Sequence, residues 1–427
     1  MNSNNESSAN SLPGPENVTR VELPNGIIVL ARSSFSTPSF AISGYLDGGS
    51  IGDPDDRLGL AQFTALALTR GTQKYSFQDF SERVESAGAS VGFGAGIESA
   101  SFSVHGLAED FSMLLELLGE SLFHPTFPEE QTRRLQAQLL TGLAMRGQDT
   151  AEMADLTLSE VLFPNHPYGR PEDGYPETVR AIQREDLQTF HRNHYGPRGM
   201  VFSVVGALEP DKVIDQIERV FGTWKNPNQM PAPAVPPNPE LQDKVRRHVP
   251  IPGKSQTDIA MGVYGPKRTS EEYIPVLVAN NILGQFGMMG RIGEAVRENA
   301  GLAYYATSGL DAWTEGGTWQ ISAGVNPTNV DRAVDLILEE VRRFVAEPVT
   351  PQELEDSAAN ITGRLPLSLE SNAGVAGALL TLERFQLGLD YYQRYPEMVR
   401  SVTRERILEV ARQYLDFDRM AIITAGP

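Results

Sequence analysis

LGLAQFTALALTRGT, residues 58–72, is the stretch that most constrains the fold. Almost every side chain from 58 to 70 is apolar, and a helix that is apolar on all sides is buried in a core. Two earlier segments, near 27–32 and 40–47, read as strands. The pattern therefore predicts a buried helix that follows a pair of strands.

The rest of the first half continues this mixture of strands and helices. A helix is predicted to begin after Ser76, because Asp79 three residues later completes a capping box. Strands are expected within 87–99 and 100–107, where apolar residues alternate, and helices fill about 108–195.

The second half reads as a weak repeat of the first. RNHYGPRGMVFSVVG (192–206) corresponds to ARQYLDFDRMAIITAG (411–426) at an offset of 220, which aligns Met200 with Met420 and Gly206 with Gly426. A helix is expected near 271–283 and strands near 303–311 and 318–325, and Thr350 with Glu353 predicts a further helix start. We expect two homologous α+β domains, each a mostly antiparallel sheet packed with helices.

A proline-rich segment separates the two halves. KNPNQMPAPAVPPNPEL (225–241) contains six prolines, which exclude a helix or an inner strand. We expect a disordered tail at 1–20, a first domain at 21–224, this segment as a linker, and a second domain at 242–427.

Composition excludes several classes of function. The chain has no cysteine, so disulfide scaffolds and thiol chemistry are excluded, and its 36 basic against 55 acidic residues give a net charge of −19, unlike a nucleic-acid binder. This net charge indicates either an acidic surface or an acidic cavity that attracts basic peptides. With no apolar run long enough to span a membrane and no targeting segment at the start, the sequence predicts a cytoplasmic protein.

Segment 58–72 and the repeated halves resemble the pitrilysin/insulinase-type zinc metallopeptidases, and in particular the subunits of processing peptidases. Active members carry a G-L-A-H-F-L-E-H-x-x-F-K-G-T motif in which H-x-x-E-H supplies two zinc ligands and the general base. This chain keeps the flanking residues of the motif and has Gln62, Ala65 and Leu66 at the three chemical positions. The family's third ligand is a Glu on a later helix, and residues 135–148 contain no acidic residue. The resemblance thus implies a clam-like pair of domains with a degenerate zinc site, and no metal or cofactor in this chain.

The six histidines offer no evident replacement for the zinc site. His191 and His194 are close in sequence but lack a neighbouring carboxylate or third histidine. They are more simply interpreted as a favourable charge at a helix C-terminus and a packing residue.

The second half retains a different motif of the family. The segment 297–304 matches R-E-x-x-G-L-A-Y, and the resemblance implies that Arg297 and Tyr304 reach a bound peptide and polarise its scissile carbonyl. On the residues alone, Arg297 could equally favour the helix end before Gly301, and Tyr304 could simply alternate with Tyr305 along a strand.

A glycine-rich loop precedes that motif. By the same resemblance it contacts substrate, through Gly284, Phe286, Gly287, Met288 and Gly290. Glycine frees the backbone, and methionine adapts to varied peptides. The alternative is a plain connector between two helices.

Together these features predict a non-catalytic, substrate-binding subunit similar to the alpha subunit of mitochondrial processing peptidase. A homologous partner with an intact H-x-x-E-H would supply zinc and the general base, and the pair would act on peptides. Two alternatives remain: a structural scaffold, like the core proteins of a respiratory complex, or a homodimer that binds peptides without cutting them.

Overall fold

The computed structural model describes residues 12–239 and 241–427, which form two compact units. The first unit contains the described residues up to Leu143, Pro171–Ala234 and Pro366–Gln393. The second contains Ala144–Arg170, Val235–Leu365 and Arg394–Pro427. Each unit therefore takes a segment from the other half of the chain.

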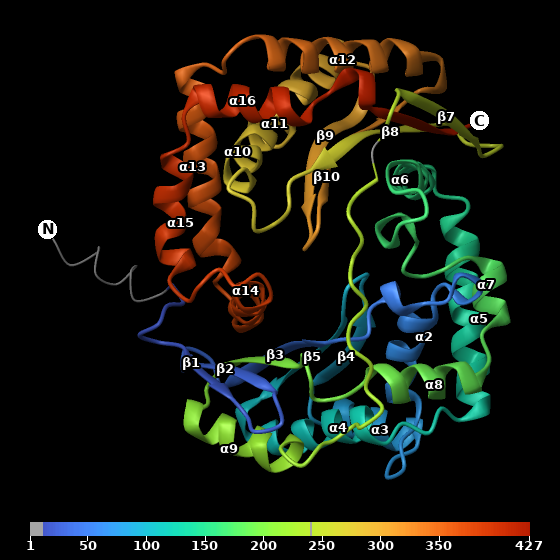
Figure 1. Ribbon diagram of the computed structural model, residues 1–427, viewed down its shortest axis with the longest axis vertical. Helices are drawn as coiled ribbons and strands as arrows, with labels where there is room; N and C mark the ends of the chain where they lie inside the picture. The colour runs from blue at the N-terminus through green and yellow to red at the C-terminus, as the bar shows by residue number, and fades with distance from the viewer. Residues whose placement is uncertain (1–11, 240) are drawn as a thin grey trace, which may run out of the picture. The chain divides into compact units, whose positions relative to one another are not determined.

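The first unit is built on a six-stranded sheet (Figure 1). The strand order is β1-β2-β6-β3-β5-β4, and every pairing is antiparallel except that of β2 with β6. The strands are β1 Thr19–Glu22, β2 Ile28–Ser33, β3 Ser39–Leu46, β4 Ser90–Ala95, β5 Ala100–Leu107 and β6 Val201–Gly206. Its helices are α2 Leu60–Ala67, α3 Phe77–Ser86, α4 Phe111–Phe123, α5 Glu129–Arg146, α7 Pro176–Ala181, α8 Arg184–His194, α9 Pro210–Phe221 and α14 Asn372–Arg384.

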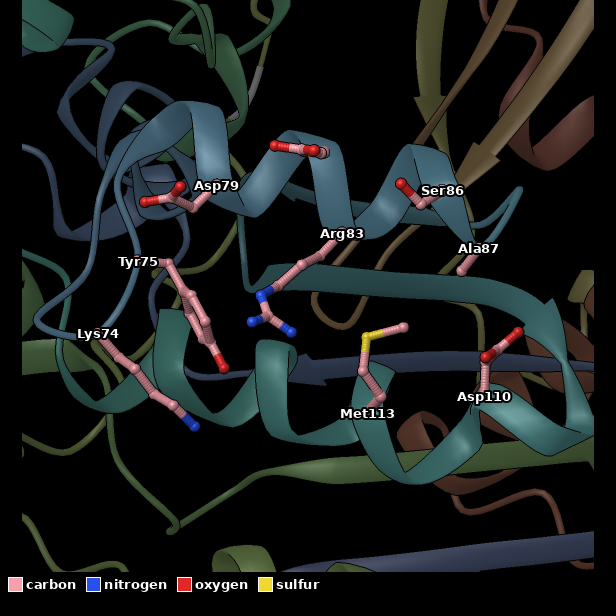
Figure 2. A pocket seen from close by; sticks show the side chains of 9 residues that line it. Lys74, Tyr75, Asp79, Arg83, Ser86, Ala87, Asp110 and Met113 are labelled. Carbon is pink, nitrogen blue, oxygen red and sulfur yellow. The ribbon is translucent and has the colours of Figure 1, made fainter.

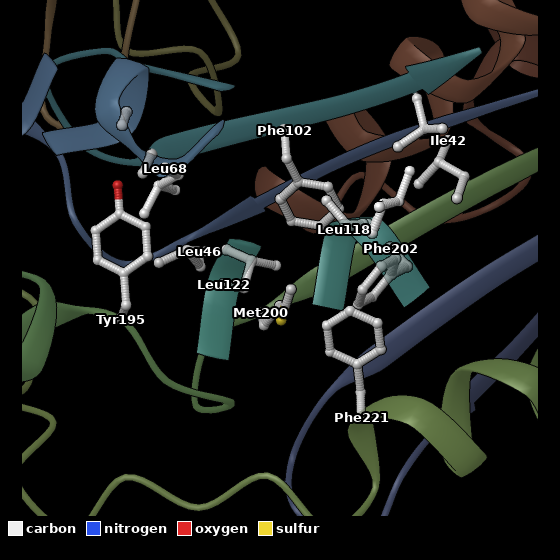
Figure 3. Close-up of a cluster of buried hydrophobic side chains, with 14 of the residues drawn as sticks. Ile42, Leu46, Leu68, Phe102, Leu118, Leu122, Tyr195, Met200, Phe202 and Phe221 are labelled. Atoms are coloured by element: carbon white, nitrogen blue, oxygen red, sulfur yellow. The ribbon is translucent and has the colours of Figure 1, made fainter. Parts of the chain in front are cut away.

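The core of the first unit lies between this sheet and its helices (Figure 3). Phe102 and Phe202 of the sheet meet Phe221 of α9, with ring centroids 4.9 Å apart in both the Phe102–Phe202 and the Phe202–Phe221 pair. Leu118 and Leu122 of α4 complete the cluster. Burial of these large side chains supplies most of the driving force for packing the helices on the sheet.

The second unit has a five-stranded sheet of the order β7-β11-β8-β10-β9. Only the pairing of β7 with β11 is parallel. The strands are β7 Val245–Pro250, β8 Thr257–Gly265, β9 Ala303–Ala312, β10 Gly317–Val325 and β11 Ala421–Gly426. The helices are α6 Thr150–Leu162, α10 Tyr273–Gly284, α11 Phe286–Gly293, α12 Val330–Ala346, α13 Pro351–Ser368, α15 Tyr391–Arg400 and α16 Arg404–Tyr414.

The two sheets repeat one topology. Strands β2-β6-β3-β5-β4 of the first correspond in order and direction to β7-β11-β8-β10-β9 of the second. The repeat predicted from Met200 with Met420 and from Gly206 with Gly426 is confirmed, because both pairs bracket the equivalent strands β6 and β11. The predicted α+β class is confirmed as well. In this correspondence, β4 and β9 are the equivalent edge strands.

The exchanged segments occupy equivalent places on the two sheets. Helix α14, from the second half of the chain, packs on β3 and β6, while α6, from the first half, packs on β8 and β11 (Figure 1). Gly262 on β8 permits the close approach of α6, because a Cβ there would lie 3.0 Å from a methyl of Leu158. Polar contacts fix α14: Arg20 on β1 donates two hydrogen bonds to the buried Glu383 carboxylate, at 2.9 and 2.8 Å.

Several local predictions are confirmed, with changed boundaries. The capping box at Ser76 forms, with the Ser76 hydroxyl accepting from the Asp79 N–H at 3.1 Å. The predicted helix 58–70 is shorter and begins at Leu60, because Gly59 has a left-handed φ of +94°. The described residues of the proline-rich segment contain no helix or strand.

Residues 1–11 of the predicted tail lie outside the described residues, and its last residues, Thr19 and Arg20, begin β1. Among the helices that the structure describes, none has the length and apolar character needed to cross a bilayer.

We expect the Arg20–Glu383 pair to hold α14 on its sheet. Replacing Glu383 with Gln should lower the free energy of unfolding by about 2 kcal/mol, since it weakens two charge-assisted bonds to a buried group. Chemical denaturation measures this loss. The exposed pair Arg134–Glu130 is the control, and Glu130→Gln should cost about 0.5 kcal/mol or less. Equal effects of the two substitutions would contradict a special role for Glu383.

Candidate functional site

The start of helix α2 is fixed by a buried carboxylate. Asp53 is 4% exposed, and its two oxygens accept hydrogen bonds from the backbone N–H groups of Gly59 and Ala61, each at 2.9 Å. The first N–H groups of a helix have no partner within the helix, so this contact satisfies two of the chain's buried donors. Sequence reasoning missed Asp53, because it lies in the preceding loop and matches no local capping pattern.

The three degenerate zinc positions take part in packing and hydrogen bonding. The side-chain oxygen of Gln62 accepts from the Ala95 N–H of edge strand β4 at 2.7 Å. Ala65 is fully buried, and Leu66 packs against the core of the first unit. A metal ion would find only the amide of Gln62 here, and that oxygen is already engaged.

Most of the segment 135–148, which was predicted to lack the third ligand, lies in helix α5, where Leu135 and Leu143 are buried. Within residues 12–239 and 241–427, no three His, Cys, Asp or Glu side chains come together in a way that could hold a metal. The residues present therefore do not fit the zinc ion of the family's active members.

The histidine pair has a purely structural environment. The Nε2 atom of His191 lies 2.8 Å from the Leu122 carbonyl oxygen, and the ring stacks on Tyr195. Burial lowers the pKa of His191 to about 4, so the ring is neutral at pH 7. Burial also lowers the pKa of His194, whose ring packs against Phe190. The interpretation of His191 as a favourable charge at the helix end is therefore wrong, and both rings are packing residues.

The Arg–Tyr motif spans a turn between a helix and an edge strand. Arg297 lies in the π-helical turn Glu294–Asn299. Gly301, which follows this turn, has a φ of +64°. The side chain of Arg297 is one-third exposed, with Nε 3.6 Å from a Glu298 carboxylate oxygen. Tyr304 lies near the start of β9 and is 74% exposed. The turn thus joins the element that carries Arg297 to the strand that carries Tyr304.

A β-bulge determines how Tyr304 is presented. Across the strand pair, Gly324 faces Tyr305 and Val325 faces Ala303, so Tyr304 is an extra residue without a partner on β10. A bulge redirects a side chain and is common at sheet edges near functional sites. The large exposed area of Tyr304 follows from this local irregularity, which regular alternation along the strand would not have produced.

The residue after the bulge is held in place by a buried carboxylate. The Tyr305 hydroxyl donates to Asp258 at 2.7 Å, and Asp258 is 2% exposed. Burial, reinforced by this hydrogen bond, raises the pKa of Tyr305. The Gln256 side chain also donates to Asp258, and Thr150 of the exchanged helix α6 contacts it too. The start of β9 is therefore anchored through Tyr305, next to the exposed Tyr304.

The glycine-rich loop is irregular within α11. Gly287, Met289 and Gly290 all have positive φ values, so the segment does not continue the helix. Glycine permits such backbone angles at 287 and 290. Gly284 is the last residue of α10. A Cβ on Gly284 would lie 2.4 Å from Ser308, which is too close for a side chain.

Four of the predicted loop residues line a pocket of about 500 Å³. They are Phe286, Gly287, Met288 and Gly290, while Gly284 does not line it. The opposite wall includes Glu353 and Asp356 of α13, and Glu294 and Glu298 add further carboxylates. The pocket combines apolar side chains with an acidic rim.

An ion pair joins this pocket to the start of α13. Arg291 donates to both Glu353 carboxylate oxygens, at 2.6 and 2.8 Å. The predicted cap also forms, since Glu353 N–H donates to the Thr350 hydroxyl and Thr350 N–H to Glu353. Burial alone would raise the pKa of Glu353, but the hydrogen bonds from Arg291 and Thr350 lower it to about 2.

Another pocket, of about 700 Å³, lies between α3 and α4 in the first unit (Figure 2). Arg83 and Lys74 lie 4.9 and 5.1 Å from the centre of the Tyr75 ring, and Asp79 belongs to the capping box. These side chains serve cation–π and capping contacts that fix α3. Sequence reasoning made no prediction for this pocket.

Comparison with known proteins identifies the family. A family model described as "Insulinase (Peptidase family M16)" matches residues 28–171, and one described as "Peptidase M16 inactive domain" matches residues 181–361. The chain belongs to this insulinase-like family. Its substitutions at Gln62, Ala65 and Leu66 make it a member of the non-catalytic type.

Individual proteins are similar to this chain over most of its length. A protein of Mycobacterium leprae described as an uncharacterized zinc protease is 24% identical over 96% of this chain and 92% of its own length. The beta subunit of mitochondrial-processing peptidase from Saccharomyces cerevisiae is 22% identical over 83% of this chain and 79% of its own. A solved structure described as a peptidase M16 inactive domain, from Pseudomonas fluorescens, has a TM-score of 0.89 and 26% identity, and covers 96% of this chain and 98% of that one.

Asp53 should be essential for the stability of helix α2. Replacing Asp53 with Ala should lower the free energy of unfolding by about 2–3 kcal/mol, because two buried N–H groups lose their acceptors. Denaturant titration measures the change. Asp56 is exposed and pairs with neighbouring Arg57 at the surface, so Asp56→Ala should cost about 0.5 kcal/mol or less. A loss as small for Asp53→Ala would contradict the capping role.

Glu353 should stabilise the protein in a pH-dependent manner. Its pKa is lower in the folded state than the ordinary value of 4.5, so its contribution is present above pH 4.5 and is lost as the pH falls through about 2. Glu353→Gln should cost about 2 kcal/mol at pH 7, after discounting for partial exposure, and progressively less below pH 4.5. Thermal unfolding across this pH range tests it, with exposed Glu355→Gln as the control. A cost that stays constant with pH would refute the assignment.

Proposed function

We propose that this protein is the non-catalytic, substrate-binding subunit of a heterodimeric zinc peptidase. Its partner is a homologous chain with an intact H-x-x-E-H. The partner supplies zinc and the general base, and this chain supplies Arg297 and Tyr304 to the peptide bond that is cleaved. The observation that carries the proposal is the contrast between the lost zinc ligands and the retained Arg–Tyr motif.

The chemistry of the two retained side chains supports their role. A guanidinium and a phenol are both hydrogen-bond donors, and a carbonyl oxygen gains negative charge during hydrolysis. Arg297 is partly exposed and Tyr304 is mostly exposed, so both are accessible to a ligand. A merely structural tyrosine would gain nothing from the bulge that exposes it.

Two further features support a peptide as the ligand. The pocket beneath Phe286 and Met288 offers apolar contacts with carboxylates around them. A net charge of −19 favours association with peptides that carry basic residues.

The heterodimer is supported by the similarity to a subunit of mitochondrial-processing peptidase. Purification of the chain alone and with its partner tests the arrangement. We expect zinc and peptide cleavage only in the pair, and a permanent interface should bury more than about 1,000 Å². Zinc-dependent cleavage by this chain alone would refute the proposal. A stable homodimer, or co-purification with a membrane complex, would favour the peptide-binding homodimer or the scaffold instead.

The Arg–Tyr motif should affect turnover by the pair. Arg297→Gln and Tyr304→Phe should each lower kcat by roughly 10²-fold, because each removes a donor to the developing oxyanion. The measurement is cleavage of an arginine-containing fluorogenic peptide by the reconstituted pair. Arg332→Gln, an exposed arginine of the same unit, serves as the control and should leave turnover unchanged. Unchanged turnover in the two motif variants would reject their role.

A further inference from the structure

Arg297 and Tyr304 lie on different elements, and a methionine connects them. The sulfur of Met289 accepts a hydrogen bond from the Ala306 backbone N–H at 3.4 Å. It also lies 4.0 Å from a terminal guanidinium nitrogen of Arg297. Ala306 is two residues beyond Tyr304 on β9, so one sulfur atom contacts both the arginine and the strand that carries the tyrosine.

The backbone of the loop directs this side chain inward. Met289 has a φ of +75°, an uncommon conformation for a residue with a side chain. The neighbouring Met288 has an ordinary φ and is 55% exposed, whereas Met289 is half-buried. A Cβ on Gly293 would lie 2.5 Å from the Cβ of Met289, so only glycine at 293 leaves room for it. Strained conformations of this kind persist where the surroundings hold them, and they concentrate at functional sites.

The hydrogen bond also uses an amide that the sheet leaves open. Among the strands that the structure describes, β9 has a neighbour on the β10 side only, and the Ala306 N–H is directed to Met289. The sulfur of methionine is a weak hydrogen-bond acceptor, and the methionine side chain is long and flexible. Met289 can therefore hold Arg297 and β9 together while the loop still adjusts to a ligand.

We propose that Met289 is a positioning residue that keeps the Arg297 guanidinium in register with Tyr304 for a bound peptide. The inference rests on the function proposed above and adds a residue to its site. Met289 acts through Arg297 and β9, and makes no contact of its own with the reacting carbonyl.

The first test needs no ligand. Met289→Leu keeps the volume of the side chain and removes the sulfur acceptor, so hydrogen exchange at the Ala306 amide should become about five- to tenfold faster. Met398→Leu, which replaces a half-buried methionine elsewhere in the same unit, should leave the Ala306 rate unchanged. An unchanged rate in Met289→Leu would overturn the proposal.

The second test separates positioning from simple packing. A fluorescein-labelled, unstructured peptide that contains arginines is titrated into the original chain, Met289→Leu, Arg297→Gln and the double variant. Met289→Leu should weaken binding about three- to tenfold in the original chain and less than about twofold in the Arg297→Gln background, because its effect passes through Arg297. Equal losses in both backgrounds would overturn the positioning role. Failure of the original chain to bind the peptide, alone and with its partner, would instead overturn the proposed function, and the exchange result distinguishes the two outcomes.

Discussion

The central strands β6 and β11 are covered on both faces, and this constraint shapes the whole chain. Every residue of β6 and of β11 is buried, so these central strands have apolar neighbours above and below. Each half of the sequence provides helices for only part of that cover. Helix α14 completes the first sheet and α6 completes the second, and both pack on equivalent strands. The exchange explains why buried polar anchors, Arg20–Glu383 in one unit and Asp258 in the other, occur where the borrowed helices sit.

The same requirement for burial explains why helix α2 is stable although it carries no metal-binding residues at positions 62, 65 and 66. The helix is held by burial of Leu60, Phe63 and Ala65 and by the Asp53 cap, so its fold needs no ion. Gln62 contributes a further contact, since its amide oxygen accepts a hydrogen bond from edge strand β4. At the equivalent edge of the other sheet, β9 keeps Tyr304 exposed on a bulge. Equivalent edges of a repeated fold therefore carry different side chains.

Local features of the fold could be predicted from the sequence, and long-range ones could not. The capping boxes at Ser76 and Thr350 depend on residues three positions apart, and both formed as predicted. The exchanged helices were missed, because periodicity shows that a helix has an apolar face but not which sheet will cover it. The charge assigned to His191 was wrong for a related reason, since burial against Leu122 is invisible in the sequence. The roles of Met289 and of the Tyr304 bulge depend on backbone angles and strand register, which composition does not reveal.

The exchanged helices also limit how this protein can be divided into fragments. A chain cut within the proline-rich segment would give two fragments, each with a sheet missing one of its covers and with a helix lacking its own sheet. Neither fragment could fold as an independent domain, although the two could complement one another when produced together.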